Sequence, residues 1–277
     1  MTQFCDLHTH SVFSDGTCTP AEIIDEAVAL GLKAVALTDH DSVDGLPDFL
    51  AAAEGKPIEA VAGAEFAVVY DGIELHLLAL YIPVAGFAPI ARLMEQVHAR
   101  REQCVHDLVD SLNRAGFQLD FNKIKAEASG QVTRAHVALA IEATGRMTSE
   151  EAFLTLMRPG KGHYVSPQRL PFDEVLELIL QVGAVPILAH PFLNMTQPQL
   201  EEFLPRAKEK GLAGLESLYS GFDAETTALA FQMAERFGLL PSGGSDFHGH
   251  IRKEAPLGNG QRPVPYAFAQ NLGAYTK

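Results

Sequence analysis

The stretch FCDLHTHSVFSDGTCTPAEIIDEAVALGLKAVALTDH, residues 4–40, predicts a strand, a helix and a second strand. The short apolar run Phe4–His8 is typical of a buried strand, and residues 34–38 form a second such run. Between them, TPAE at residues 19–22 supplies an N-cap Thr, a Pro at the first helical position and a Glu at the third. Such a unit joins two parallel strands through a helical crossover.

The same alternation continues along the chain. A helix is expected over 46–54, followed by two β-rich runs, 59–69 and 73–81, that flank the hairpin signal Asp71-Gly72. Beyond the middle of the chain we expect helices and strands in turn: helix 172–182, strand 184–189, helix 197–210, strand 212–218, helix 223–236 and strand 239–243. The pattern predicts about seven strands in a barrel-like α/β domain.

The middle of the chain has a different character. Residues 88–115 form one long, charged helical pattern, and shorter helical patterns follow at 133–144 and 149–157. We therefore expect a barrel domain built from residues 1–85 and 171–277, with a helical insertion at 86–170 that covers the active site. A length of 277 residues suits either one barrel with one insertion or two ordinary domains.

Composition narrows the function classes. Apolar residues make up 47% and charged residues 20%, which indicates a globular chain. The net charge of −14 argues against binding of duplex nucleic acid, because phosphate backbones are gripped mainly by Lys and Arg. Three scattered cysteines predict neither a disulfide framework nor a cysteine-based zinc site. With no signal-peptide pattern and no apolar run of membrane length, we expect a cytoplasmic protein without membrane contact.

Histidines and carboxylates gather where the predicted strands end. In an α/β barrel the carboxyl ends of the strands share one face, so residues far apart in sequence meet there. The chain has eleven histidines, and six of them, with three acidic residues, fall in or just after the predicted strands or in the loop after the first: His8, His10, Asp15, His40, Glu65, His76, His190, Asp246 and His248.

These residue types are the usual ligands of zinc, manganese and iron. The i, i+2 spacing of His8 and His10 places both imidazoles on one side of a strand, and Asp246 and His248 repeat that spacing. Six imidazoles and three carboxylates exceed what one ion accepts, since zinc takes four or five ligands. The pattern therefore predicts two or three metal ions, with Glu65 as a bridge.

Four segments resemble the ordered motifs of the PHP (polymerase and histidinol phosphatase) superfamily. DLHTHS at 6–11 with SDGT at 14–17 resembles the first, LTDHDSVDGL at 37–46 the second, AHP at 189–191 the third and GGSDFHG at 243–249 the fourth. The resemblance covers residue 4 to about 250. It implies a distorted seven-stranded, TIM-like (β/α)7 barrel and a trinuclear site for divalent Mn²⁺, Zn²⁺ or Fe²⁺.

The resemblance also implies a ligand set for each ion. One ion would be held by His8, His10, Glu65 and Asp246, a second by Glu65, His76 and His190, and a third by Asp15, His40 and His248. A degenerate module of this family would have lost several of these residues. The nucleophile would be a water that bridges the metals, with no separate catalytic side chain.

The insertion resembles that of nucleotide-directed PHP phosphoesterases. The matching segments are TRAHVA at 133–138, EAF at 151–153 and KGHYV at 161–165. This group includes enzymes that act on 3′,5′-bisphosphonucleotides and enzymes that remove 5′ nucleotides from short RNA. The resemblance implies that Arg134, His136 and Lys161 grip phosphate, with Arg158 as a further candidate.

The function that these features predict is hydrolysis of nucleotide phosphomonoesters by metal-activated water. Three divalent ions would add about +6 against three ligand carboxylates, which would make an electropositive pocket despite the acidic chain. That favours small nucleotides or short oligonucleotide ends as substrates. The alternatives are a phosphatase for histidinol phosphate or another small phosphate ester, a catalytically silent metal-binding regulatory module, and a metal-dependent amidohydrolase barrel.

Overall fold

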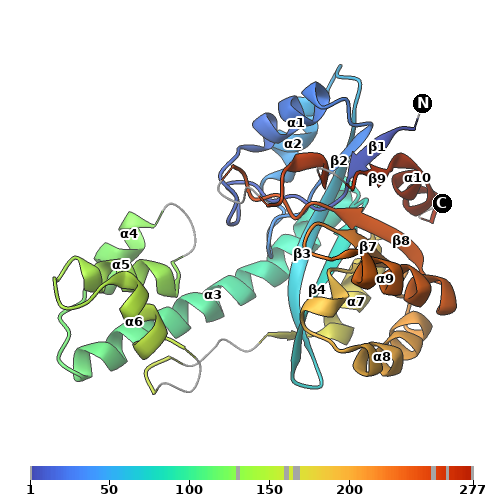
Figure 1. Cartoon of the computed structure of the whole chain (residues 1–277). Helices are drawn as coiled ribbons and strands as arrows, with labels where there is room; N and C mark the ends of the chain where they lie inside the picture. Colours follow the sequence, from blue (N-terminus) through green and yellow to red (C-terminus); the bar gives the residue numbers. More distant parts are fainter. Residues whose placement is uncertain are drawn as a thin grey trace. The chain divides into compact units, whose positions relative to one another are not determined.

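The computed structural model describes residues 2–128, 132–158, 162–164, 169–250, 254–259 and 262–275. The chain divides into two compact units. The larger joins Met1–Arg92 to Arg169–Lys277, and the smaller is Leu93–Gln168 (Figure 1). These divisions fall a few residues inside the predicted 86–170 insertion.

The opening strand–helix–strand unit forms as its sequence predicts. Strand β1 (Phe4–Asp6) pairs in parallel with β2 (Ala34–Leu37), and helix α1 (Pro20–Ala29) connects them. The amide of Glu22 donates to the Thr19 hydroxyl over 3.3 Å, and the Thr19 amide donates to the Glu22 carboxylate over 2.7 Å. This reciprocal capping box satisfies two amides that would otherwise lack helical partners.

One sheet organises the larger unit. Its principal strands are β1, β2, β3 (Glu59–Tyr70), β4 (Ile73–Leu80), β6 (Val185–Leu188), β7 (Gly214–Tyr219) and β8 (Leu240–Gly244). Their order in the sheet is β8-β7-β6-β4-β3-β2-β1. Two short strands are added to these seven: β5 (Leu170–Pro171) pairs with β3, and β9 (Val264–Pro265) pairs with β1. The described residues thus form nine strands, and the two that the sequence analysis missed have two residues each.

The two ends of the sheet approach each other and nearly close it into a barrel. Just beyond β1, the Leu7 amide donates to the Gly243 carbonyl over 3.1 Å, and the Asp246 amide donates to the His8 carbonyl over 2.9 Å. A parallel bridge between Thr9 and Phe247 continues this contact. The predicted distorted barrel is therefore confirmed.

Strand β4 is the exception to parallel pairing. It runs antiparallel to β3, through the predicted Asp71-Gly72 turn, and antiparallel to β6. The amino-terminal half of β4 consequently lies beside the carboxyl-terminal half of β3, with His76 opposite Ala67. A side chain early in β4 thereby reaches the same end of the barrel as side chains that follow the other strands.

Helices cover the outside of the sheet (Figure 1). They are α1, α2 (Leu46–Ala53), α7 (Phe172–Gln181), α8 (Gln197–Glu209), α9 (Ala224–Arg236) and α10 (Tyr266–Tyr275), with short 3₁₀ turns at Pro191–Leu193 and Leu257–Asn259. An apolar cluster that includes Cys5, Leu80, Ile187 and Leu272 joins strands β1, β4 and β6 to α10. Helix α10 is not among the helices expected from the sequence.

The smaller unit is helical. The long helix α3 (Val84–Arg114) supplies residues from Leu93 onward, and α4 (Phe121–Glu127), α5 (Arg134–Glu142) and α6 (Ser149–Leu156) follow. Leu112, Val137, Ile141 and Ala152 are fully buried in its core. No helix in the described part of the chain combines the length and apolar character needed to cross a membrane.

Candidate metal centre

The nine histidines and carboxylates singled out in the sequence lie together at one end of the barrel. Eight of them form three overlapping groups, within each of which the ligating atoms lie within 4.8 Å of one another. The groups are His8, His10, Glu65 and Asp246; His10, Asp15, His40 and His248; and His40, Glu65 and His76. Only His190 is outside these groups, and it contacts Glu65 directly.

Glu65 is the centre of the arrangement. Its side chain is fully buried on β3. Its two oxygens lie 2.8–3.3 Å from nitrogens of five histidines, namely His8, His10, His40, His76 and His190. A single carboxylate between so many imidazoles has the geometry of a bridging ligand.

His190 and Asp246 both hold unusual backbone conformations. His190 has φ +24° and Asp246 has φ +56°. Such conformations cost roughly 1–3 kcal/mol for residues other than glycine and cluster at functional sites. The His190 amide donates to the buried Glu216 carboxylate over 2.7 Å, and the Tyr219 hydroxyl donates to Asp246 Oδ2 over 3.0 Å.

The group around Asp15 is the more accessible part of the cluster. Asp15 Oδ1 lies 3.1 Å from His248 Nε2, and the side chain of Asp15 is 52% exposed. His40 is 26% exposed, whereas His8, His10 and Glu65 are fully buried. The site therefore has a deep floor and one side that solutes can approach.

Several buried polar atoms in the cluster have no hydrogen-bond partner. They are His8 Nε2, both ring nitrogens of His10, Glu65 Oε2 and His248 Nε2. Buried polar atoms are normally hydrogen-bonded, so such a concentration needs an explanation. Imidazole nitrogens and carboxylate oxygens that point at one another without hydrogen bonds are what divalent cations would satisfy, and the donor set fits zinc, manganese or iron.

The carboxylates also control the charges of the imidazoles. Burial lowers the pKa of His10 to about 3. Burial acts the same way on His76, but the Glu65 carboxylate overrides it and raises the pKa of His76 to about 10. Although burial opposes its charge, the pKa of Glu65 is held well below its usual range by the neighbouring His40, His8 and His76. The negative charge of this centre thus attracts cations, whether protons or metals.

Two buried carboxylates outside the candidate ligand set hold this cluster in place, and the first of them, Asp6, was not predicted from the sequence. Asp6 is fully buried and accepts from the amides of Ser245 (3.0 Å) and Gly258 (2.8 Å), which anchors the loop that carries Asp246. Asp39 accepts from the Ser11 amide over 2.7 Å and so anchors the loop after His10. Both residues lie within the quoted motifs, so their position in the sequence was a usable signal.

Glu216 was missed as well. It is fully buried on β7, with Oε1 3.0 Å from His8 Nδ1. Its signal was a lone acidic residue in the otherwise uncharged strand Gly214–Tyr219.

The residues predicted to grip phosphate belong to the smaller unit. The Arg134 guanidinium donates to the Met157 carbonyl over 2.9 Å and lies 5.0 and 4.4 Å from the ring centroids of Phe153 and Tyr164. His136 Nδ1 accepts from the Thr133 amide over 3.1 Å at the start of α5. Lys161 lies outside the described residues. Phosphate binding by these three residues stays a prediction.

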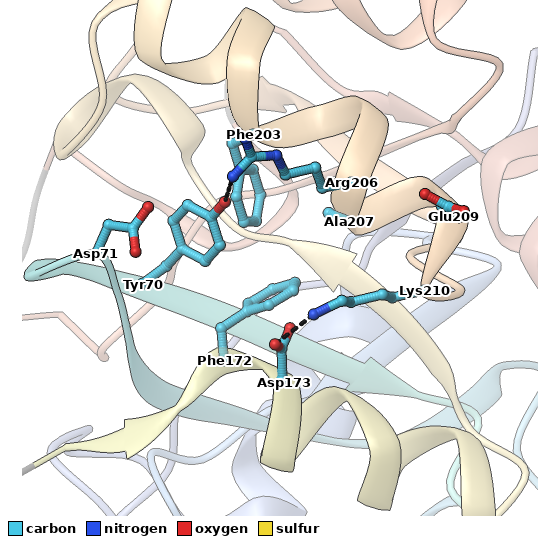
Figure 2. A pocket seen from close by; sticks show the side chains of 9 residues that line it. All are labelled: Tyr70, Asp71, Phe172, Asp173, Phe203, Arg206, Ala207, Glu209 and Lys210. Carbon is cyan, nitrogen blue, oxygen red and sulfur yellow. Dashed lines mark hydrogen bonds and ion pairs between the residues drawn. The ribbon is translucent and has the colours of Figure 1, made fainter.

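A separate hollow of about 320 Å³ lies between the β3–β4 hairpin and helices α7 and α8 (Figure 2). Tyr70 and buried aromatic rings line it. Its two cationic side chains are already engaged, since Arg206 donates to the Tyr70 hydroxyl and Lys210 pairs with Asp173 (Figure 2). None of the nine clustered residues lines this hollow, so the histidine cluster remains the candidate site.

Comparison with known proteins identifies the family. Residues 6–166 match the PHP domain, a span of more than half the chain. The chain belongs to the PHP-domain family. A 5′-3′ exoribonuclease from Haemophilus influenzae is 31% identical over 250 residues, which cover 90% of this chain and 91% of the relative. A 3′,5′-nucleoside bisphosphate phosphatase from Chromobacterium violaceum is 30% identical, with 88% of this chain and 86% of the relative covered.

Solved structures agree with this PHP assignment. A protein from Bifidobacterium adolescentis, provisionally assigned as a metal-dependent phosphoesterase, superimposes with a TM-score of 0.78 at 28% identity and covers 98% of this chain and 96% of its own. The predicted resemblance to nucleotide-directed PHP phosphoesterases is therefore confirmed, and the protein is a hydrolase of phosphate esters.

Proposed function

We propose that this PHP protein hydrolyses phosphate esters of nucleotides, either a phosphomonoester of 3′,5′-bisphosphonucleotides or the ester bond that releases a nucleotide from the 5′ end of a short oligonucleotide. The observation that carries the proposal is the ring of buried and partly buried imidazoles around Glu65, with unsatisfied nitrogens on His8 and His10 directed at carboxylates. The two nucleotide-directed relatives, each covered over most of its length, support the substrate class.

The proposed centre takes three divalent ions, Mn²⁺, Zn²⁺ or Fe²⁺. His8, His10, Glu65 and Asp246 would hold one, Glu65, His76 and His190 a second, and Asp15, His40 and His248 a third. When bound, such ions lower the pKa of water to provide a nucleophile near neutral pH, and they neutralise phosphate oxygens.

The chain's own residues orient the ligands and set the charge of the site. Glu65 contacts histidines that are assigned to all three ions, so its carboxylate sets the spacing between those histidines. Asp15, Glu65 and Asp246 contribute about −3 against about +6 from three ions, which leaves roughly +3 for an anionic phosphate ester. Asp15 lies on the accessible side, where the phosphate would enter. No side chain needs to form a covalent intermediate.

A panel of phosphate esters tests the substrate. The purified chain is loaded with Mn²⁺, Zn²⁺ or Fe²⁺ in turn and given adenosine 3′,5′-bisphosphate, a short 5′-phosphorylated RNA and histidinol phosphate, with release of phosphate or nucleotide as the readout. We expect turnover of one or both nucleotide substrates. Efficient hydrolysis of histidinol phosphate alone would overturn the substrate class, and no turnover with any metal would favour a silent module.

Metal binding should release protons. Although burial opposes ionisation of all three residues, neighbouring carboxylates raise the pKa values of His8, His40 and His76 above the ordinary value, so the metal-free centre holds protons at neutral pH. A metal must displace them, because only the neutral imidazole is a ligand. We expect the apparent affinity to rise with pH up to about pH 10, where the pKa of His76 lies. Calorimetric titration in buffers of different ionisation enthalpy measures the protons released, and pH-independent binding would contradict the prediction.

Arg134→Ala tests the predicted phosphate contact. If Arg134 binds substrate phosphate, losing a charge-assisted hydrogen bond should raise KM roughly 10- to 100-fold with little change in kcat. The matched control is Arg146→Ala, because Arg146 also donates to a backbone carbonyl, that of Gly116, and lies over an aromatic ring, that of Phe117. Equal losses of thermal stability with an unchanged KM in both variants would show that Arg134 is purely structural.

A further inference from the structure

Strand β7 supplies none of the nine clustered residues, yet it contacts three of them. The Glu216 carboxylate contacts His8 and His190, and the Tyr219 hydroxyl donates to Asp246. In a regular strand, residues three apart point to opposite faces of the sheet. Two side chains with that spacing can reach one site only if the strand is irregular.

The irregularity is a bulge in the pairing of β7 with β8. Glu216 pairs with Ser242 and Leu218 pairs with Gly243, so Ser217 is an extra residue on β7. One extra residue reverses the alternation beyond it and re-aims the following side chains. The bulge therefore turns Glu216 and Tyr219 toward the same cluster.

The two oxygens of Glu216 are divided between two histidines. Oε1 lies 3.0 Å from His8 Nδ1, and Oε2 accepts from the His190 amide over 2.7 Å. The two imidazoles stack with centroids 5.7 Å apart. With Nδ1 of His8 facing Glu216, the other nitrogen, Nε2, is directed at Glu65, 3.3 Å from Oε2. Glu216 itself belongs to none of the three candidate ligand groups.

We propose that Glu216 is a positioning residue that orients His8 and His190 together and so couples the two metal ions that these histidines hold. The inference rests on the proposed metal centre, in which the two histidines serve different ions. A carboxylate that holds the far nitrogen of a ligating imidazole fixes its ring orientation and raises its basicity. Because one carboxylate also holds the strained backbone of His190, movement at either ion is transmitted to the other.

Glu216→Gln tests the proposal. The glutamine side chain has the same volume but only one accepting oxygen, so it cannot accept hydrogen bonds from both His8 Nδ1 and the His190 backbone amide. We expect metal affinity to fall about 10- to 100-fold, the usual effect of losing such a partner, with the two affected ions lost together. The readout is metal content per chain after dialysis against graded chelator, with Mn²⁺ as the probe. Ser217→Ala is the matched control, because Ser217 is a buried polar neighbour whose hydroxyl donates within β7, to the Leu215 carbonyl.

Thermal unfolding separates positioning from packing. A positioning role predicts that Glu216→Gln reduces the rise in Tm on adding Mn²⁺, whereas a residue that merely fills the core would lower Tm equally with and without metal. If Glu216→Gln retains as much metal as the wild-type chain, the inference is overturned. The proposed function still stands in that case if both chains hydrolyse substrate. A wild-type chain that binds no metal would overturn both. If Glu216→Gln does not fold, Glu216→Asp is measured in the same way, and its shorter carboxylate should weaken binding too.

Discussion

Replacing Glu65 with Gln should nearly abolish phosphoester hydrolysis. Glu65 lies within 3.3 Å of five imidazoles, and the proposed ions share its carboxylate. Mutation of residues that only orient metal ligands typically lowers activity about 10- to 100-fold. Loss of a ligand that the ions share should therefore lower activity by more than about 100-fold. The Gln variant should also bind fewer metal ions per chain, which elemental analysis of the purified protein measures.

The control for this variant is Glu59→Gln in the same strand. Glu59 is half-buried, accepts from the Tyr266 hydroxyl over 2.9 Å and belongs to none of the candidate ligand groups. It should keep its metal and most of its activity. If Glu65→Gln hydrolyses substrate at the rate of Glu59→Gln, the proposed metal bridge is wrong.

Asp246→Asn should cause a loss of similar size, more than about 100-fold in turnover. The Asp246 carboxylate lies 3.1 Å from His10 Nε2 and 3.5 Å from His8 Nε2, and the substitution removes the negative charge that binds both protons and cations. Asparagine tolerates the positive φ of +56° at this position, so the backbone should be preserved. Circular dichroism should therefore be unchanged while metal content and turnover fall.

Asp71→Asn provides the matched control for that change. Asp71 has φ +47° at the tip of the β3–β4 hairpin, so the chemical substitution and the backbone region are the same. Its side chain is exposed and lies outside the candidate ligand groups. Equal activity losses in the two variants would point to a general effect of removing charge and would refute the ligand role of Asp246.

Local signals made most of the fold predictable. The capping box at Thr19 and the Asp71-Gly72 turn depend on residues a few positions apart, and both form as expected. Helix α4 was missed although Asp120 caps it by accepting from the Asn122 amide, because the helix has only seven residues. Strand β9 was missed because it is two residues long and exists only through its pairing with β1.

The candidate ligands were predictable because each lies beside a strand or in a motif. The Asp71-Gly72 hairpin signal predicts that β4 runs back along β3, and this reversal, rather than the shared carboxyl ends of parallel strands, brings His76 to the right end of the barrel. Glu216 could not be assigned a role from sequence, because its partner His8 is 208 residues away and its direction depends on a bulge.

Closure of the barrel has a consequence for how the protein is made. The Asp246 amide donates to the His8 carbonyl, so the segment around His8 cannot complete this contact until the segment after β8 has been synthesised. His8, His10, Asp15, His40, Glu65 and His76 leave the ribosome well before His190, Asp246 and His248. A growing chain thus carries an acidic, histidine-rich part of the cluster, and the enclosed arrangement forms only when β8 docks. Contacts of such long sequence separation form slowly. We therefore expect complete metal loading to follow the synthesis of β8, whose docking completes the site.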